Sequence, residues 1–155
     1  MTSVRVSLVD LYVLRGAGPS LECLTLRRAA GGRCPGSWET VHGHIEPGER
    51  PAEAARRELR EETGLVPHSL YNLSRVELFY QHRQDEVDLV PVFVAFVEPK
   101  ADVALGSEHD GAEWLPVAEA VRRLAWPRER RALEDAVALL GEGSAGPVED
   151  VLRVC

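Results

Sequence analysis

The sequence predicts an α/β fold, more specifically an α/β/α sandwich in which helices cover both faces of a mixed β-sheet. Two observations indicate this fold: strand-like apolar runs before residue 100, and apolar residues at helical spacing in one central and two C-terminal segments. With 155 residues, 45% of them hydrophobic and 28% charged, the chain suffices for about one compact domain with its own core. We expect this single domain to span residues 1–141 and a tail to follow at residues 142–155.

The N-terminal segment predicts a β-hairpin followed by a loop and a short strand. Residues 4–14 and 20–27 are strand-like runs, and the sequence Gly16-Ala17-Gly18-Pro19 between them favours a turn. Residues 29–36 are rich in glycine and are expected to form a loop. A short strand is expected at residues 39–45, so this segment supplies the first strands of the sheet.

The next segment predicts a helix over residues 51–63. Pro51 has the backbone angle of a first helical turn, and Gly64 stands where helices commonly end in the left-handed conformation. One face of this helix carries the small or apolar residues Ala52, Ala55 and Leu59. Such a face lets the helix pack closely against a sheet.

The remaining segments predict two strands and then two helices. The strands are expected at residues 73–81 and 87–97, which are rich in aliphatic and aromatic residues. Apolar residues at helical spacing predict helices at residues 116–124 and 127–140, and the glycines of Gly141-Glu142-Gly143 mark the end of the second helix. The sequence contains no evident internal repeat.

The central helix carries a dense set of carboxylates. Glu58, Glu61 and Glu62 are spaced i, i+3 and i+4, so their side chains lie side by side on one helical face. Their repulsion costs roughly a few tenths of a kcal/mol per pair, and a bound cation reverses the sign of this effect. Carboxylate oxygens suit Mg²⁺ or Mn²⁺, and the cluster offers no ligand that zinc or copper would prefer. The pattern predicts a divalent-metal site whose other positions are left to water and substrate phosphates.

The stretch Gly43–Leu65 reads G-x5-E-x7-R-E-L-x-E-E-x-G-L, and it resembles the complete Nudix box at every position. Trp38 and the segment Glu108–Leu115 also fit, so the resemblance extends over about residues 3–141. It implies the Nudix type of α/β/α sandwich. It further implies a hydrolase of phosphoanhydrides in nucleoside diphosphate-X substrates, with Mg²⁺ or alternatively Mn²⁺ as the cofactor.

The resemblance implies a role for each charged residue of the box. Arg57, whose guanidinium can hold a carboxylate in a bidentate pair, would steady a catalytic glutamate. Glu58 and Glu62 would be the main metal ligands, with Glu61 assisting, and the carbonyl of Gly43 would add a backbone oxygen. The spacing does not decide which glutamate acts as the general base.

Residues outside the box complete the expected site. Glu108, in a polar loop between two glycines, resembles the further acidic ligand or base that Nudix enzymes often draw from another loop. Phosphate contacts are expected from Arg27 or Arg28, and from Arg5, because the guanidinium fork matches phosphate oxygens. His42, just before the box glycine, is expected to form a hydrogen bond with the substrate.

Three segments suggest the substrate: Val41–Glu46, Phe79–Arg83 and Glu108-His109. They are most similar to dihydroneopterin triphosphate pyrophosphatases, which also act on dATP-like nucleotides. The first prediction is therefore a nucleoside triphosphate-like substrate that is cleaved to the monophosphate and pyrophosphate. Tyr80, with its neighbours His82 and Arg83, is a candidate for base recognition.

Two alternatives stay open. One is hydrolysis of ADP-ribose or of a dinucleoside polyphosphate, since Tyr80 lies close to where enzymes of the latter class carry a tyrosine. The other is a Nudix-fold module that binds a nucleotide without cleaving it, because fold alone does not imply activity. Such modules would be expected to have lost box carboxylates, and this chain retains all of them. The residues therefore favour catalysis.

Charge and composition limit the partners. The formal net charge of −7 argues against a general nucleic-acid binder, which would normally show a basic face. The N-terminal apolar stretch is broken by Arg5, Ser7 and Asp10, so neither a secretory signal nor a membrane span is predicted. The three cysteines are an odd number without a C-x-x-C pattern, which favours free thiols. We expect a cytoplasmic protein without a membrane partner, and the resemblance adds a homodimer as an option.

Overall fold

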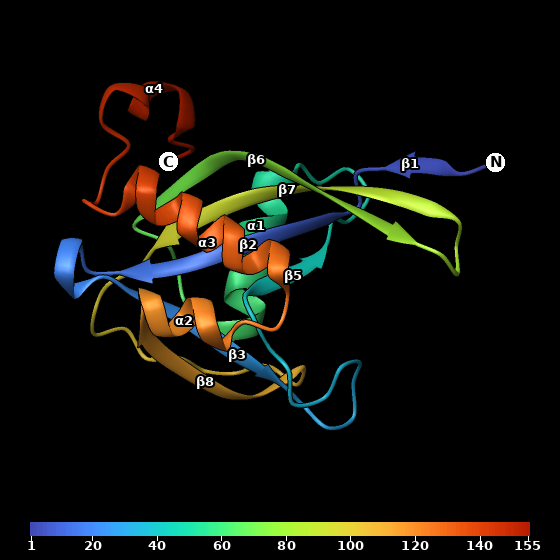
Figure 1. Cartoon of the computed structure of the whole chain (residues 1–155), viewed down its shortest axis with the longest axis horizontal. Helices are drawn as coiled ribbons and strands as arrows, with labels where there is room; N and C mark the ends of the chain where they lie inside the picture. Colours follow the sequence, from blue (N-terminus) through green and yellow to red (C-terminus); the bar gives the residue numbers. More distant parts are fainter.

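The computed structural model describes all 155 residues, as an eight-stranded mixed β-sheet with helices on both of its faces (Figure 1). The strands are β1 (Ser3–Arg5), β2 (Leu8–Arg15), β3 (Glu22–Arg28), β4 (Trp38–Glu39), β5 (Val41–His44), β6 (Ser69–Gln81), β7 (Glu86–Phe96) and β8 (His109–Pro116). The helices are α1 (Pro51–Thr63), α2 (Val117–Arg123), α3 (Pro127–Leu140) and α4 (Glu149–Leu152), with short 3-10 turns η1 (Gly18–Ser20) and η2 (Gly146–Val148). None of these helices combines the length and the apolar character needed to span a lipid bilayer. The predicted α/β/α sandwich with a mixed sheet is confirmed.

Strand β2 lies in the middle of the sheet and is buried along nearly its whole length. It runs parallel to β7 over Asp10–Leu14 and antiparallel to β5 over Leu8–Leu11. Its antiparallel contact with β3 is limited to two residue pairs next to the turn, after which β3 pairs with β8. The predicted hairpin is therefore formed only next to its turn. Because β2 is apolar on both faces, it lies inside the sheet and pairs mainly with β5 and β7.

The side chains of β2 alternate between two separate cores. Tyr12 and Leu14 pack against α2, α3 and the C-terminal residues, whereas Leu11 and Val13 pack against α1. Figure 1 shows α2 and α3 in front of the sheet and α1 behind it. The alternation of a strand thus fills both layers of the sandwich from one short segment.

The predicted helix over residues 51–63 is confirmed as α1. Gly64 follows it with a φ of 73°, in the left-handed region, and its backbone N–H donates to the carbonyl of Arg60. At the other end the side chain of Glu53 accepts a hydrogen bond of 2.8 Å from the backbone N–H of Arg50. The buried residues Ala55 and Leu59 seat the helix on the sheet, while Glu58 and Glu62 are also buried and only Glu61 of the three carboxylates is exposed.

Strand β6 begins at Ser69, four residues before the predicted start. A register shift between Asn72 and Val76 interrupts its pairing with β7, and Ser74 in this bulge has a φ of 57°. The side chain of Asn72 accepts a hydrogen bond of 2.9 Å from the backbone N–H of Ser74. The polar residues Asn72 and Ser74 therefore belong to a β-bulge within one strand.

The C-terminal residues pack against β6. Ala145 and Leu152 are buried in the same core as α3, and the hydroxyl of Tyr71 donates to Glu149 over 2.7 Å. The backbone of Leu70 also forms hydrogen bonds with Val154 and Cys155. The segment 142–155 is thus folded onto the sheet, while the division of the chain at residue 141 stays a prediction.

Candidate functional site

Arg57 connects the start of the box to the carboxylate face of α1. Its guanidinium holds Glu49 in a bidentate pair, with N···O distances of 2.8 and 3.0 Å. It also donates to Glu58 at 2.9 Å, to Glu61 at 3.1 Å and to the carbonyl of His44 at 2.7 Å. The hydrogen bond to Arg57 lowers the pKa of Glu49 to about 2. Arg57 is therefore placed to orient these carboxylates, and its part in catalysis stays a prediction.

Glu58 packs directly against the backbone of Gly43 in β5. A Cβ atom at residue 43 would lie 2.1 Å from Cδ of Glu58 and 2.3 Å from its Oε1. Only glycine allows this approach, so the first position of the box makes room for the Glu58 carboxylate. Burial raises the pKa of Glu58, against the opposing effect of Arg57.

Glu62 is the most unusual carboxylate of the group. Its residue is only 4% exposed, and neither carboxylate oxygen has a hydrogen-bond partner. Burial raises its pKa to about 10, with further contributions from the charges of Glu58, Glu108 and Glu39. A buried carboxylate without a partner is costly, and a cation at this position would provide both the charge and the contacts that are missing. The residues present therefore fit a divalent ion.

Glu108 is brought to Glu62 by a loop that is fixed to the end of α1. Ligand atoms of Glu62, Glu108 and His109 all lie within 4.8 Å of one another. The backbone N–H groups of Ala104 and Gly106 donate to the carbonyls of Thr63 and Glu62, at 2.8 and 3.2 Å. The loop and the helix thus form one unit that could hold a metal.

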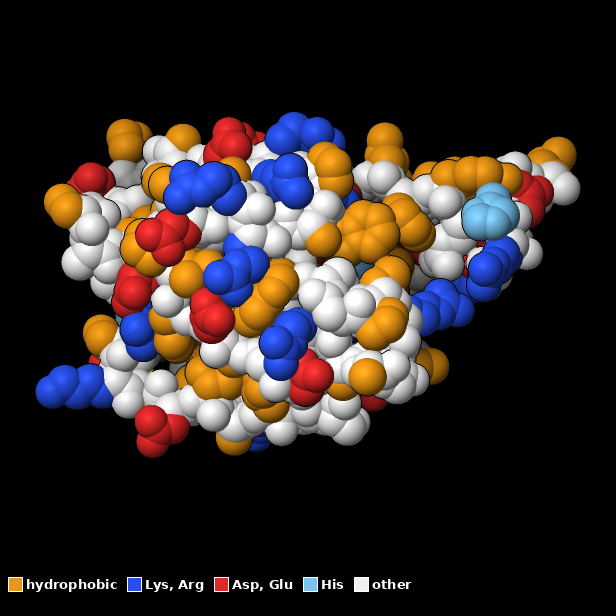
Figure 2. Space-filling view, turned by 60° about the horizontal axis from the view of Figure 1, so that its bottom comes forward, with side chains coloured by type: hydrophobic (Ala, Val, Ile, Leu, Met, Phe, Trp, Pro, Cys, Tyr) orange, Lys and Arg blue, Asp and Glu red, His pale blue; other side chains and the backbone are white.

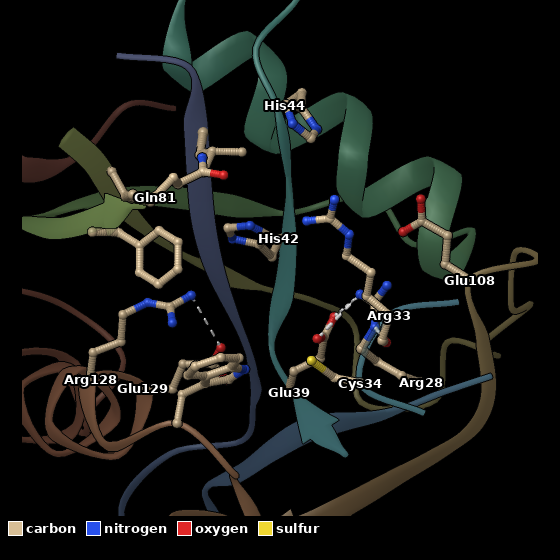
Figure 3. Close-up of a pocket in the computed structure, with 14 residues that line it drawn as sticks. Arg28, Arg33, Cys34, Glu39, His42, His44, Gln81, Glu108, Arg128 and Glu129 are labelled. Carbon is tan, nitrogen blue, oxygen red and sulfur yellow. Dashed lines mark hydrogen bonds and ion pairs between the residues drawn. The ribbon is translucent and has the colours of Figure 1, made fainter. Parts of the chain in front are cut away.

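A cavity of about 380 Å³ adjoins this acidic group (Figure 3). Glu108, Arg28 and Arg33 lie on one side of it, and Arg128 and Gln81 lie on the other, with His42 between the two sides. The aromatic rings of Phe79 and Trp126 lie near Arg128. Leu8 and Val90 also line the cavity. The cavity is therefore charged at one end, and at the other end aromatic residues lie beside Arg128.

Behind the cavity, His42 is held by a buried ion-pair network. Its Nδ1 lies 2.6 Å from Oδ1 of the fully buried Asp10, and Arg128 donates to the same carboxylate at 3.2 and 3.5 Å. Burial opposes ionisation of Asp10, but the hydrogen bonds and charges of His42 and Arg128 lower its pKa overall. Burial and the nearby Asp10 raise the pKa of Glu129, whose Oε1 accepts the backbone N–H of Thr40 at 3.0 Å. The pKa values of these two buried acids are thus shifted in opposite directions.

Comparison with known proteins agrees with this geometry, since the family model for the NUDIX domain matches residues 4–136. The chain belongs to the NUDIX family. A solved structure of an Ap4A hydrolase from C. elegans, in a binary complex, superimposes with a TM-score of 0.72 at 24% identity, covering 88% of this chain and 98% of that one. This similarity shows the NUDIX fold and no more.

This chain also matches two curated relatives, each over less than two thirds of the relative's own length. An octanoyltransferase from Myxococcus xanthus is 37% identical over 137 residues, which are 84% of this chain and 36% of that protein. The nucleoside triphosphatase NudI from Salmonella arizonae is 32% identical over 88 residues, which are 52% of this chain and 62% of that protein. The chain therefore spans less than two thirds of the curated relatives described here.

Two of the predicted substrate-binding residues do not line the cavity of this NUDIX domain. Arg5 lies on β1 and pairs with Glu86 at 3.1 Å, while Arg27 pairs with Asp110 at 2.7 Å. Because successive side chains of a strand point to opposite faces, Arg28 lines the cavity in place of Arg27. The structure thus brings His42 to the cavity, and neither Arg5 nor Arg27.

The same alternation decides between neighbours on β6. Phe79 and Gln81 line the cavity, whereas the hydroxyl of Tyr80 donates to Asp85 at 3.0 Å and Tyr80 lies outside the lining. Glu61 is also peripheral, because its side chain is 56% exposed and paired with Arg57. If the register of β6 were known, it would show that Phe79 faces the cavity and that Tyr80 does not.

Several residues of the NUDIX site are absent from the sequence-based prediction. They are Asp10, Glu39, Trp126, Arg128 and Glu129. A visible signal exists for Asp10, which is a charged residue inside an otherwise apolar strand. For Trp126 and Arg128 no local signal exists, because their position depends on how α3 docks on the sheet.

Proposed function

We propose that the protein is a divalent-metal-dependent pyrophosphohydrolase that cleaves a nucleoside triphosphate-like substrate to the monophosphate and pyrophosphate. The observation that carries this proposal is Glu62, a buried carboxylate with two unpartnered oxygens beside Glu58 and Glu108. A fold without use for a cation would gain by replacing such a residue. Membership of the NUDIX family agrees with this reading.

In this proposal Glu58, Glu62 and Glu108 hold Mg²⁺ or Mn²⁺, with the Gly43 carbonyl as a further oxygen and Glu61 assisting from the rim. Such an ion neutralises charge that develops on the phosphates and lowers the pKa of an attacking water. Arg57 is a positioning residue, since its guanidinium holds carboxylates rather than facing the cavity.

The charged end of the cavity suits the phosphates. Arg28 lines it but donates to Glu39 at 3.2 and 3.4 Å and to the carbonyl of Arg33. The guanidinium of Arg33 has no hydrogen bond or ion pair. Arg33 is therefore the cation most available for a phosphate, and Arg28 would supply a second contact.

The other end of the cavity supports a nucleoside-type substrate. Cζ of Arg128 lies 5.2 Å from the ring centroid of Trp126 and 5.9 Å from that of Phe79. Aromatic faces and a guanidinium plane are surfaces on which a heterocyclic base stacks. The cavity volume of about 380 Å³ falls within the usual range for small-molecule sites. The name of the relative NudI, a nucleoside triphosphatase, points to the same class.

The surface does not favour a nucleic acid as partner. On the face shown in Figure 2, basic and acidic side chains are interspersed, without the basic stripe that is typical of nucleic-acid binders. The homodimer and the cytoplasmic location stay predictions.

Product release by the purified protein tests the proposal. It would be measured with Mg²⁺ on dATP, dihydroneopterin triphosphate, ADP-ribose and a dinucleoside polyphosphate, for the wild type, Glu62→Gln and the exposed control Glu119→Gln. We expect pyrophosphate from the first two substrates, a loss of at least about 100-fold in Glu62→Gln, and no change in the control.

Other outcomes would change the assignment. Release of AMP with ribose phosphate from ADP-ribose, or cleavage of the dinucleoside polyphosphate alone, would replace the substrate class. Nucleotide binding without any metal-dependent product would instead support the non-catalytic module.

A further inference from the structure

His109 follows Glu108 directly and carries a buried imidazole with one free nitrogen. Its side chain is fully buried, and its Nε2 lies 3.0 Å from Oε2 of Glu39. The other ring nitrogen, Nδ1, has no partner. A buried polar nitrogen without a partner is costly, so its retention requires an explanation.

The contacts of Glu39 fix the tautomer of this ring. Arg28 donates to the Glu39 carboxylate at 3.2 and 3.4 Å, and a carboxylate can only accept from His109. Nε2 of His109 therefore carries the hydrogen, and Nδ1 presents a lone pair. Histidines that bind metals are usually held in this way, with one nitrogen donating to a carboxylate and the other free for the ion.

The free lone pair belongs to a residue that already stands at the acidic group. A ring nitrogen of His109 lies within 4.8 Å of a carboxylate oxygen of both Glu62 and Glu108. Two ligands of one ion, with bonds of about 2.0 to 2.2 Å, are separated by about 4.4 Å at most. The separation of these three groups is therefore close to that of ligands that share one ion.

We propose that His109 is a nitrogen ligand of the metal centre, together with Glu62 and Glu108. The centre is then not the all-oxygen site that the box alone predicts. Imidazole suits zinc and other transition metals, whereas Mg²⁺ prefers oxygen ligands. The site discriminates among divalent ions, and it favours Mn²⁺ and Zn²⁺ over Mg²⁺ more strongly than carboxylates alone would. This inference uses the metal centre of the proposed function, but it does not depend on the substrate.

Pulsed electron paramagnetic resonance with bound Mn²⁺ tests this ligation without any turnover. We expect nitrogen coupling in the wild-type protein, its loss in His109→Gln, and its retention in His44→Gln, a matched control that also lines the cavity. Absence of nitrogen coupling in the wild type, or its loss in the His44 variant alone, would overturn the proposal.

Metal affinity gives a second readout, measured by calorimetry for Mn²⁺, Zn²⁺ and Mg²⁺. We expect His109→Gln to weaken Mn²⁺ and Zn²⁺ by about 10- to 100-fold and Mg²⁺ much less. An equal loss for all three ions would mean that the histidine only supports the fold. If His109→Gln does not fold, the variant lacking the four other histidines, His42, His44, His68 and His82, decides, because retained coupling then assigns the nitrogen to His109 and lost coupling contradicts it.

The proposed function and the proposed role of His109 can be rejected independently of each other. Hydrolysis with Mg²⁺ in a protein without nitrogen coupling would keep the proposed function and reject His109 as a ligand. Nitrogen coupling without hydrolysis of any substrate would do the reverse.

Discussion

A side chain at residue 43 would collide with Glu58, a residue of the proposed metal site. At Gly43 the space of the missing side chain is filled by Glu58, whose Cδ, Oε1 and Cγ atoms would all lie within 2.6 Å of a new Cβ atom. Glu58 is a flexible side chain, so the fold can yield by moving it. The displacement would remove a carboxylate from the place where Arg57 holds it.

We therefore predict that Gly43→Ala weakens Mg²⁺ binding by about 10- to 100-fold while it costs at most about 3 kcal/mol of stability. Gly31→Ala is the matched control, because a Cβ atom at residue 31 meets nothing within 4 Å. Calorimetric titration and urea unfolding of both variants check the prediction. Unchanged Mg²⁺ affinity in Gly43→Ala would contradict the role given to this contact.

Glu62 makes the stability of the metal-free protein dependent on pH. Its carboxyl has an ordinary pKa of 4.5 when unfolded and a pKa of about 10 in the fold, so between these values the unfolded chain has lost a proton that the native state keeps. Stability therefore falls as the pH rises through this window, by up to about 1.4 kcal/mol per pH unit. A bound divalent ion favours the ionised carboxylate and opposes this loss.

Urea unfolding at several pH values, in one series with a chelator and in a second series with Mg²⁺ and no chelator, measures this effect. We expect the unfolding free energy of the wild type to fall with pH more steeply than that of Glu62→Gln, and Mg²⁺ to reduce the difference. Parallel pH profiles of the two metal-free proteins would show that burial does not keep Glu62 protonated.

Among the elements, α1 has the most sharply defined end. Gly64 has a φ of 73°, and a Cβ atom there would lie 3.3 Å from Cβ of Ala104. Gly48 has a similar φ of 79°, but no atom lies within 4 Å of its Cβ position. A substitution at Gly48 therefore tests backbone strain alone, whereas a substitution at Gly64 tests strain together with crowding.

We predict that Gly48→Ala lowers stability by about 1 to 2 kcal/mol, which is the cost of the left-handed conformation alone. Gly64→Ala should cost more, because the loop that carries Glu108 must also shift away from the helix. Urea unfolding of the two variants gives the comparison. Equal losses would mean that the loop yields freely at Ala104.

Across the whole molecule, the C-terminal segment closes the core that α3 covers. Leu152 is 6% exposed within that core, whereas its neighbour Val151 is 78% exposed. Removal of residues 142–155 would uncover Leu152's neighbours in the core and the backbone of Leu70 together. The segment therefore contributes to the stability of the entire domain.

We predict that Leu152→Ala lowers the unfolding free energy by about 2 to 5 kcal/mol, and that Val151→Ala changes it by less than about 0.5 kcal/mol. Thermal and urea unfolding of both variants measure this. Equal stability of a chain shortened after residue 141 would instead support the predicted domain boundary.

The parts of this fold that local signals specify are those that the sequence predicts well. Helix α1 has a favourable first residue in Pro51, a left-handed end at Gly64 and a complete motif between them, so both its bounds and its acidic face follow from the sequence. Residue spacing alone could not assign Glu108, and the resemblance to a family supplies it. The near approach of Glu108 to Glu62 agrees with that assignment.

Contacts between distant segments are what the sequence could not supply. Arg128 and Asp10 are 118 residues apart, and their ion pair exists only because α3 docks over β2. The exchange of Arg27 for Arg28, and of Tyr80 for Phe79, depends on strand register, since a shift of one residue reverses every side chain. Long-range packing therefore decides the substrate side of the site, whereas a local motif decides the metal side.

The loop that carries Glu108 has no regular secondary structure, yet two of its amides, those of Ala104 and Gly106, are bound to the last turn of α1. Ordering a flexible segment costs about 1 to 2 kcal/mol per residue in backbone entropy. Here that cost is met when the chain folds, before any ion arrives. Capture of the proposed metal would then consist mainly of desolvation and charge neutralisation, with a smaller entropic cost for ordering the loop.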